Sequence, residues 1–285
     1  MSGVSNARRL VLPADGWGRP PLPREHGAWV MLITPLAIGL AGISPFSPGA
    51  AALLVLAVAA AFLAQNAASV LIKPRAPQST LAWLLVFTAV LAAAGLGLLA
   101  MGAWSLLWLA LPAAALFLLH VRLLKGPAAQ RLDRTAWGEL LACGALTLTG
   151  PAAAVVARGT LDATALALWL ACLVAFASGV FHVNMRLDAV KVRQAFDGPT
   201  RWRLGKGLVA FHLAMSAALA LAIALVPGPA AWMALAAYAP FVGRAGWSFV
   251  KLEQGVPSFK AIGIRETVLT TWFGLWAIAL LRVLG

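Results

Sequence analysis

The sequence predicts an all-α, polytopic membrane protein with nine transmembrane helices. Apolar residues make up 62% of the 285 positions and charged residues only 11%, whereas soluble domains contain about 25% charged residues. The charges gather in clusters that are separated by long apolar runs. Runs of about 18 or more apolar residues are typical of membrane-spanning helices. A soluble enzyme, a disordered chain and a coiled coil are therefore excluded.

The elements follow from the positions of these apolar runs. Residues 1–24 are rich in proline and basic residues, so we expect a disordered cytoplasmic leader, followed by a single nine-helix domain over residues 25–285. Each predicted helix is long enough to cross a hydrocarbon core of about 30 Å. The nine predicted helices are Gly27–Gly42, Pro48–Ile72, Leu81–Met101, Trp104–Leu124, Trp137–Ala157, Ala163–Val183, Leu204–Val226, Ala231–Val250 and Ala261–Leu284.

The connections between these helices alternate in composition. Those after the first, third, fifth and seventh helices are short and rich in Gly, Pro or Ser, and the others are basic. Of the 22 Lys and Arg residues, all but Arg158 and Arg282 fall on one side of the membrane. Basic loops mark the cytoplasmic side, so we expect a multi-pass protein of the cell membrane with its N-terminus in the cytoplasm and its C-terminus outside. The net charge of +13 then reports topology, and no nucleic-acid partner is predicted.

Several ionisable residues lie within or at the ends of the predicted helices. Such residues are costly in a membrane and often mark functional sites, although helix ends near the headgroups also collect polar residues. Their sequence spacing forms no metal motif, and no metal or cofactor is predicted. The residues on the basic side are His26, His120, Glu139, His182, His212, Arg265 and Glu266, and the two cysteines, Cys143 and Cys172, fall in apolar runs.

One pattern, Asn-x6-Lys-x-Arg, occurs twice at the basic side. Positions i and i+7 lie nearly on one face of a helix, so each Asn is expected about two turns inside the membrane, above its Lys. A buried amide needs a partner, which favours a paired polar site. The alternative is that each Asn bonds a neighbouring helix while the basic side chains reach the headgroups. The pattern comprises Asn66, Lys73 and Arg75 at the end of the second helix and Asn184, Lys191 and Arg193 at the end of the sixth.

Two resemblances extend this interpretation. The stretch Pro23–Trp29, running into an apolar helix with Pro35, resembles the opening of the YwiC-like membrane proteins, a family without an assigned activity. From Arg24 to the last helix, the layout resembles the UbiA superfamily of intramembrane prenyltransferases. That resemblance implies a nine-helix UbiA-like bundle whose active site opens to the cytoplasm, with Asp-rich motifs at the cytoplasmic ends of helices two and six.

The chain departs from both of those motifs. In the first, Asn66 matches, but Ala67, Val70 and Pro74 stand at the Asp positions, so the motif is degenerate. In the second, Asn184 and Asp188 match and Val192 replaces the following Asp. The acids of the superfamily hold Mg²⁺ for a diphosphate, so magnesium is expected here only if the chain is an active prenyltransferase.

The four basic residues of the repeat suggest a different chemistry, because Lys and Arg bind phosphate or carboxylate directly. The sequence-based hypothesis is a cytoplasm-facing cavity between helices two and six that binds an anionic lipophilic ligand, isoprenoid- or quinone-like. Arg24 and His26 join the ligand-binding set, and Asp188 is the candidate catalytic acid. Membrane lipids are the other expected partners. The alternatives are an active prenyltransferase that uses an isoprenyl diphosphate, and a transporter of small anions or lipids.

Overall fold

The computed structural model describes a chain that is almost entirely helical. The described residues are 18–23, 26–44, 47–72, 76–77, 79–124, 135–192, 197–225, 228–252 and 259–284, and none of them forms a strand. The helices are α1 (His26–Gly42), α2 (Pro48–Leu71), α3 (Ser79–Ala100), α4 (Leu106–Leu124), α5 (Ala136–Leu146), α6 (Thr149–Arg158), α7 (Ala163–Lys191), α8 (Gly198–Leu225), α9 (Pro229–Val250) and α10 (Phe259–Leu284).

Six helical segments are long and apolar enough to cross a membrane. They are α2, α3, α5 together with α6, α7, α8 and α10. The apolar parts of α1 and α4, Gly27–Gly42 and Leu106–Leu119, are shorter. Helix α9 has 22 residues but is not among these six segments, and it contains Pro240 and Arg244 in its interior. The prediction of an all-helical protein with several membrane-spanning helices is confirmed at this level, and the count of nine stays a prediction.

The fifth predicted span is broken into α5 and α6. The break falls at Thr147 and Leu148, just before Gly150 and Pro151. Proline lacks a backbone N–H and clashes with the carbonyl four residues earlier, and the residue before it disfavours helix. The Thr147 hydroxyl donates to the Cys143 carbonyl at 2.8 Å. The predicted fifth segment, Trp137–Ala157, corresponds to the candidate span Ala136–Arg158, and the interruption inside it was not predicted.

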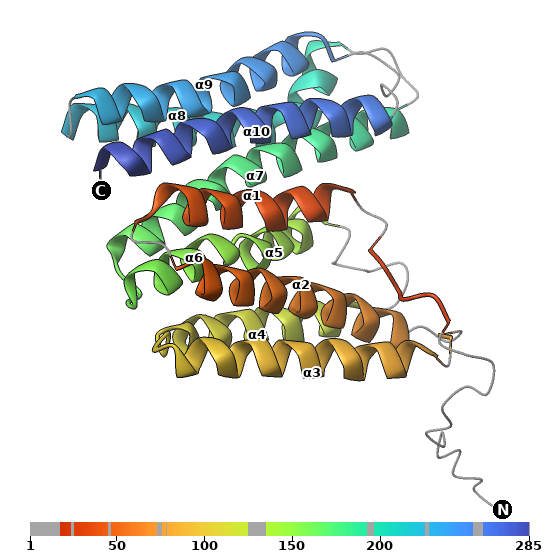
Figure 1. Ribbon diagram of the computed structural model, residues 1–285. Coiled ribbons are helices and arrows are strands. Elements are labelled where there is room, and N and C mark those ends of the chain that lie inside the picture. Colours follow the sequence, from red (N-terminus) through yellow and green to blue (C-terminus); the bar gives the residue numbers. More distant parts are fainter. Residues whose placement is uncertain are drawn as a thin grey trace, which may run out of the picture.

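The helices form two groups that α1, α5 and α6 connect (Figure 1). In Figure 1, α2, α3 and α4 lie at the bottom and α7 to α10 lie at the top. Helix α2 packs mainly against α3, whereas α1 packs against both α10 and α6. Helix α7 contacts α5, α6, α8, α9 and α10. The C-terminal group is thus organised around α7.

The main core lies where α1, α5, α7, α9 and α10 meet. Its centre contains Ile38, Cys143, Cys172, Phe241 and Phe273, each at most 2% exposed. Large apolar side chains also cover the outer faces of the helices, as at Leu96, Trp108 and Leu118. An exposed apolar surface of this kind is expected of helices that face lipid.

Helices α1 and α6 approach each other closely at Gly39. A Cβ atom placed on Gly39 would lie 2.5 Å from the Ala153 Cβ and 2.8 Å from the Gly150 carbonyl oxygen. Small residues at a helix interface let two backbones come together in a membrane. The Thr149 hydroxyl also donates to the Leu32 carbonyl at 2.9 Å. These contacts fix α1 against the broken span.

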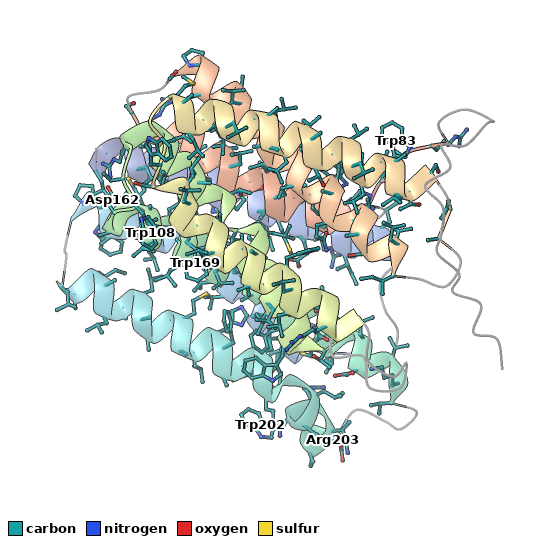
Figure 2. All side chains as sticks on the ribbon, turned by 90° about the horizontal axis from the view of Figure 1, so that it is seen from below. Trp83, Trp108, Asp162, Trp169, Trp202 and Arg203 are labelled. Atoms are coloured by element: carbon teal, nitrogen blue, oxygen red, sulfur yellow. The ribbon has the colours of Figure 1, made fainter. Side chains whose placement is uncertain are left out.

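The described residues ahead of α1 lie across the ends of α2 and α3. The Trp83 indole donates to the Gly18 carbonyl at 2.8 Å, and the Asn66 amide donates to the Pro21 carbonyl at 2.6 Å. Figure 2 shows Trp83 at this end of the bundle and Asp162 at the opposite end. Helices α2, α7 and α9 terminate at one end of the bundle, and α3, α8 and α10 begin there. We call this the basic end.

Candidate functional site

A cluster of five polar side chains lies inside the C-terminal helices, toward the basic end. Four helices contribute to it, and most of its members are almost fully buried. The cluster, called the polar cluster below, contains Ser178 and His182 from α7, His212 from α8, Arg244 from α9 and Glu266 from α10. Ionisable groups at such positions are functional candidates because their burial in a membrane is costly.

Arg244 is the centre of the polar cluster. Its Nη1 pairs with the Glu266 carboxylate, and its Nη2 donates to the Ser178 hydroxyl at 2.5 Å. The guanidinium also lies over the Phe241 ring, 5.5 Å from its centroid, which adds a cation–π attraction. The side chains of Arg244 and Glu266 are 11% and 25% exposed. This ion pair joins α9 to α10 and, through Ser178, to α7.

The Ser178 hydroxyl extends the network to α8. Its oxygen lies 2.8 Å from Nε2 of His212, and the His212 Nδ1 lies 2.8 Å from the Leu208 carbonyl oxygen. A carbonyl only accepts, so Nδ1 carries the hydrogen and the Nε2 of a neutral ring accepts from Ser178. Hydrogen bonds therefore run in one direction, from Arg244 to Ser178, to His212 and to Leu208.

The sequence at positions 178–182 allows this arrangement. Ser178 and His182 are four residues apart and lie on one face of α7. Gly179 lies between them, and a Cβ placed on it would be 3.1 Å from the Glu266 Oε2. The glycine therefore gives the carboxylate room to lie against the α7 backbone. A Cβ atom at position 179 would require the Glu266 carboxylate to shift by a few tenths of an ångström.

His182 is the member with spare hydrogen-bonding capacity. It is 7% exposed, and its buried Nδ1 has no hydrogen-bond partner in the described protein. The groups that act on it electrostatically are Arg244, Arg186, His212 and Arg265, in that order. His182 thus lies near three arginines, one of which, Arg244, is paired with Glu266. An unpartnered polar atom in such a region is a potential contact for an anion.

Two further buried atoms of the polar cluster lack partners among the described residues. They are the Arg244 Nε and the Glu266 Oε1. Unpaired buried polar atoms cost free energy and call for an explanation. Together with His182 Nδ1, they give the polar cluster donors and acceptors that the protein itself does not use.

The two asparagines of the repeated pattern have separate protein partners. Asn184 on α7 donates to the Glu139 carboxylate on α5 at 2.6 Å and to the Val180 carbonyl at 3.0 Å. Asn66 on α2 donates to Pro21. Helix α2 packs mainly against α3, and α6 and α4 are its lesser partners in the described structure. The structure thus brings Asn184 together with Glu139 and Asn66 together with the segment before α1.

Asp188 and Lys191 bind each other. The ammonium group donates to the Asp188 carboxylate at 2.8 Å, and the two side chains are 54% and 74% exposed. Asp188 therefore lies on the surface at the basic end, where Lys191 is its ionic partner. The other predicted ligand residues, Arg24, Lys73, Arg75 and Arg193, lie outside the described residues, as does the side chain of His26.

Part of the polar cluster carries a signal in the sequence, and the rest does not. His182, His212 and Glu266 are ionisable residues in apolar helices, and this signal identifies them. Arg244 was assigned to the basic loop side, although it lies within α9. Ser178 carries no sequence signal, because serine is common in membrane helices. Among the described residues, no group of three or more His, Cys, Asp or Glu side chains could hold a metal ion.

The comparisons with known proteins concern mainly the N-terminal half of the chain. Residues 22–154 match the family model described as YwiC-like protein, in agreement with the resemblance of the Pro23–Trp29 stretch. Comparison with curated proteins gave no match, and comparison with solved structures gave none either. The matched segment runs from the residues before α1 into α6, so the chain is similar to the YwiC-like proteins over this part, and the polar cluster follows it in the sequence.

Proposed function

We propose that this chain is a nine-span membrane protein that binds an anionic lipophilic molecule, isoprenoid- or quinone-like, at the polar cluster. Its N-terminus would lie in the cytoplasm and its C-terminus outside, because the basic end carries most of the Lys and Arg residues. The ligand would enter from this basic, cytoplasmic end. The observation that carries the proposal is the buried His182, whose Nδ1 is open and whose charged neighbours are arginines.

Positive potential in a poorly hydrated site favours an anion. Arg186, Arg244 and Arg265 come from three different helices and all act on His182. Electrostatic attraction is much stronger in a membrane interior than in water. Arginine also binds phosphate and carboxylate groups in a bidentate manner. A ligand with an anionic head would therefore gain contacts from His182 and from the arginines at once.

An apolar groove next to the polar cluster supports a lipophilic tail. It has a volume of about 260 Å³ and lies between α8 and α9, where Ser216, Leu219 and Val242 are among its lining residues. Ser216 follows His212 by one helical turn, and Val242 precedes Arg244 by two residues. In this proposal the groove would hold the apolar chain of a ligand whose polar end reaches toward His212, one turn from Ser216 on α8.

The basic residues of the repeated pattern remain candidates for the entrance. Lys191 lies at the basic end of α7, three turns beyond the polar cluster, and Lys73, Arg75 and Arg193 flank the same end in the sequence. In this proposal they attract the anionic head before it reaches Arg244. Asp188 and the two asparagines then serve mainly to hold the helices.

Binding in nanodiscs tests the proposal. The probe is dodecyl sulfate far below its micellar concentration, compared with dodecanol and inorganic sulfate, without divalent cations. We expect dodecyl sulfate to bind saturably, and at lower concentrations than dodecanol, which lacks the anionic head, or inorganic sulfate, which lacks the apolar chain. Arg265→Gln should weaken the binding of dodecyl sulfate by up to about fivefold, the value of one exposed charge interaction, whereas Lys260→Gln on the same exposed stretch of α10 should leave it unchanged. Equal binding of dodecanol, or equal effects of both variants, would contradict the proposal.

A transporter of small anions or lipids is a second candidate, and the broken span favours it. Transporters often contain helices that are interrupted near the middle of the membrane, and here α5 and α6 are interrupted beside Pro35 of α1. Uptake of radiolabelled phosphate into proteoliposomes would support this function. Binding without any uptake would leave the binding protein as the better description.

The UbiA-like layout keeps a prenyltransferase as a further alternative. Its support is the resemblance in span order and the match of Asn184 and Asp188 to the second motif. The test is incubation of the purified protein with farnesyl diphosphate and an aromatic acceptor, with and without Mg²⁺. Magnesium-dependent release of diphosphate, lost in Asp188→Asn, would establish the enzyme. A lack of turnover under both conditions would remove it.

A further inference from the structure

The anion site on Arg244 is already occupied by a carboxylate of the protein. Both terminal nitrogens of Arg244 are engaged, one by Glu266 and one by Ser178. We propose that Glu266 is an exchangeable counter-ion: an incoming anion replaces its carboxylate on Arg244, and Glu266 takes up one proton as it is displaced. This inference rests on the proposed function and adds that anion binding is coupled to proton uptake.

The geometry indicates that Glu266, and not Arg244, gives way. Arg244 is held by three contacts, with Glu266, with Ser178 and with the Phe241 ring. The Glu266 side chain is held through Oε2 alone, while its Oε1 has no partner among the described residues. It is also the more exposed of the two side chains, at 25% against 11%. Gly179 lets the carboxylate lie close to the α7 backbone, and a glycine has no side chain to hold it there.

Displacement without a proton would be costly. A carboxylate that loses its cation in a poorly hydrated site is destabilised relative to the neutral acid. Uptake of a proton from water removes that cost. Before exchange, the pair consists of Arg244⁺ and Glu266⁻, and after exchange Arg244⁺ pairs with the bound anion while Glu266 is neutral. One anion and one proton enter together, so the net charge of the buried site does not change.

Other titratable groups near Glu266 could also take up a proton, and the test must separate them. Helix α7 contributes His182 and Arg186, α8 contributes His212, α9 contributes Arg244, and Arg265 precedes Glu266 on α10.

Helix α1 also packs on α10. The Arg282 side chain donates to the Ala41 carbonyl, and Gly274 lies beside Thr34. These contacts set the register of the two parallel helices. In this register, backbone position 26, a histidine, lies near the level of position 266. Histidines are therefore the competing proton acceptors.

The experiment measures dodecyl sulfate binding to the full chain in nanodiscs between pH 5.5 and 8, with empty nanodiscs as background. The sulfate ester stays ionised over this range, so any pH dependence belongs to the protein. For one coupled proton, the affinity should fall about tenfold per pH unit as the pH rises. Binding in a weakly buffered solution with an indicator dye should take up about one proton per probe bound.

Two variants identify the proton acceptor. Glu266→Gln imitates the protonated acid, so it should bind at least as tightly as the wild type throughout this pH range, with no pH dependence and no proton uptake. His182→Gln, which lacks the competing imidazole, should bind the probe more weakly because His182 belongs to the proposed site, but the pH slope and the proton uptake per probe bound should persist. Because the uptake measurement also works on the wild type and on His182→Gln, the proposal can be tested even if Glu266→Gln does not fold.

The outcomes separate this inference from the proposed function. Saturable binding without a pH slope or proton uptake would overturn the exchange and leave the anion site standing. A slope that persists in Glu266→Gln, or uptake that disappears in His182→Gln, would assign the proton to another group and also overturn it. An absence of saturable binding by the wild type at every pH would remove both the exchange and the anion site.

Discussion

The Arg244–Glu266 pair should be energetically coupled far more strongly than an exposed ion pair of the same protein. Arg244→Met removes the cation that pairs with Glu266 and the hydrogen-bond donor to Ser178, so we expect the free energy of unfolding to fall by about 3 kcal/mol. This is the lower end of the range for breaking a buried ion pair, because Glu266 is 25% exposed. Glu266→Gln leaves Arg244 its contacts with Ser178 and Phe241, and the loss should be about 1–2 kcal/mol. The double variant should lose less stability than the sum of the two single losses, and the difference, which is the coupling energy of the pair, should be about 1–3 kcal/mol.

The matched control is the pair Arg158–Asp162 at the opposite end of the bundle. Its side chains are 32% and 34% exposed and four residues apart. Asp162 also accepts from the Ala165 backbone N–H at 2.9 Å, but this cap cancels in the coupling energy of a double-mutant cycle. The expected coupling in Arg158→Met and Asp162→Asn is about 0.5 kcal/mol.

Unfolding in mixed micelles with increasing SDS gives the free energy of unfolding for each variant. The two cycles should be measured at the same pH and lipid content, so that only the site differs. A coupling energy at Arg244–Glu266 no larger than that of the control would refute the reasoning. It would mean that the pair is hydrated or absent in the membrane, and the polar cluster would lose its central contact.

Three further predictions concern the framework. Gly39→Ala should lower the free energy of unfolding by about 1–3 kcal/mol, because its new Cβ atom would lie 2.8 Å from the α6 backbone. The control Gly95→Ala, which has no atom within 4 Å of its new Cβ, should be neutral or stabilising. Equal shifts of the unfolding temperature in the two variants would contradict this prediction. Hydrogen bonds from the Thr200 side chain and backbone lower the pKa of Asp197. The difference in stability between the wild type and Asp197→Ala should therefore persist near neutral pH and shrink as the pH falls below about 4. A difference that grows in acid would show that these hydrogen bonds do not stabilise the start of α8. Asn66→Ala should increase proteolysis near Pro21, whose carbonyl it binds, and unchanged cleavage would show that the contact does not hold the segment.

Much of the secondary structure could be predicted from the apolar runs. The second segment was expected at Pro48–Ile72 and is found at Pro48–Leu71, because Ser47 caps its start and Pro74 follows its end. The sixth and seventh were expected to be shorter. Helix α7 continues to Lys191 and α8 begins at Gly198, since basic residues form helix readily outside the apolar core, where hydropathy gives no signal.

The site could be predicted only in part. The repeated Asn-x6-Lys-x-Arg pattern correctly placed Asn184 at a polar contact but could not show that its partner is Glu139, 45 residues away. The pairing of Asn66 with Asn184 rested on equal depth in the membrane. Equal depth does not bring two helices together, and here α1, α5 and α6 lie between α2 and α7 (Figure 1).

The sequence by itself determined that this chain is built from apolar helices and which of their ends are basic, because both properties are local: a helix satisfies its own backbone, and hydropathy is read residue by residue. It also marked His182, His212 and Glu266 as unusual. Only the tertiary structure decided that these residues meet Ser178 and Arg244, because that depends on how each helix is rotated about its axis and on its neighbours. The contact between Ser178 and Arg244 spans 66 residues, and four separate helices must pack correctly before the polar cluster exists.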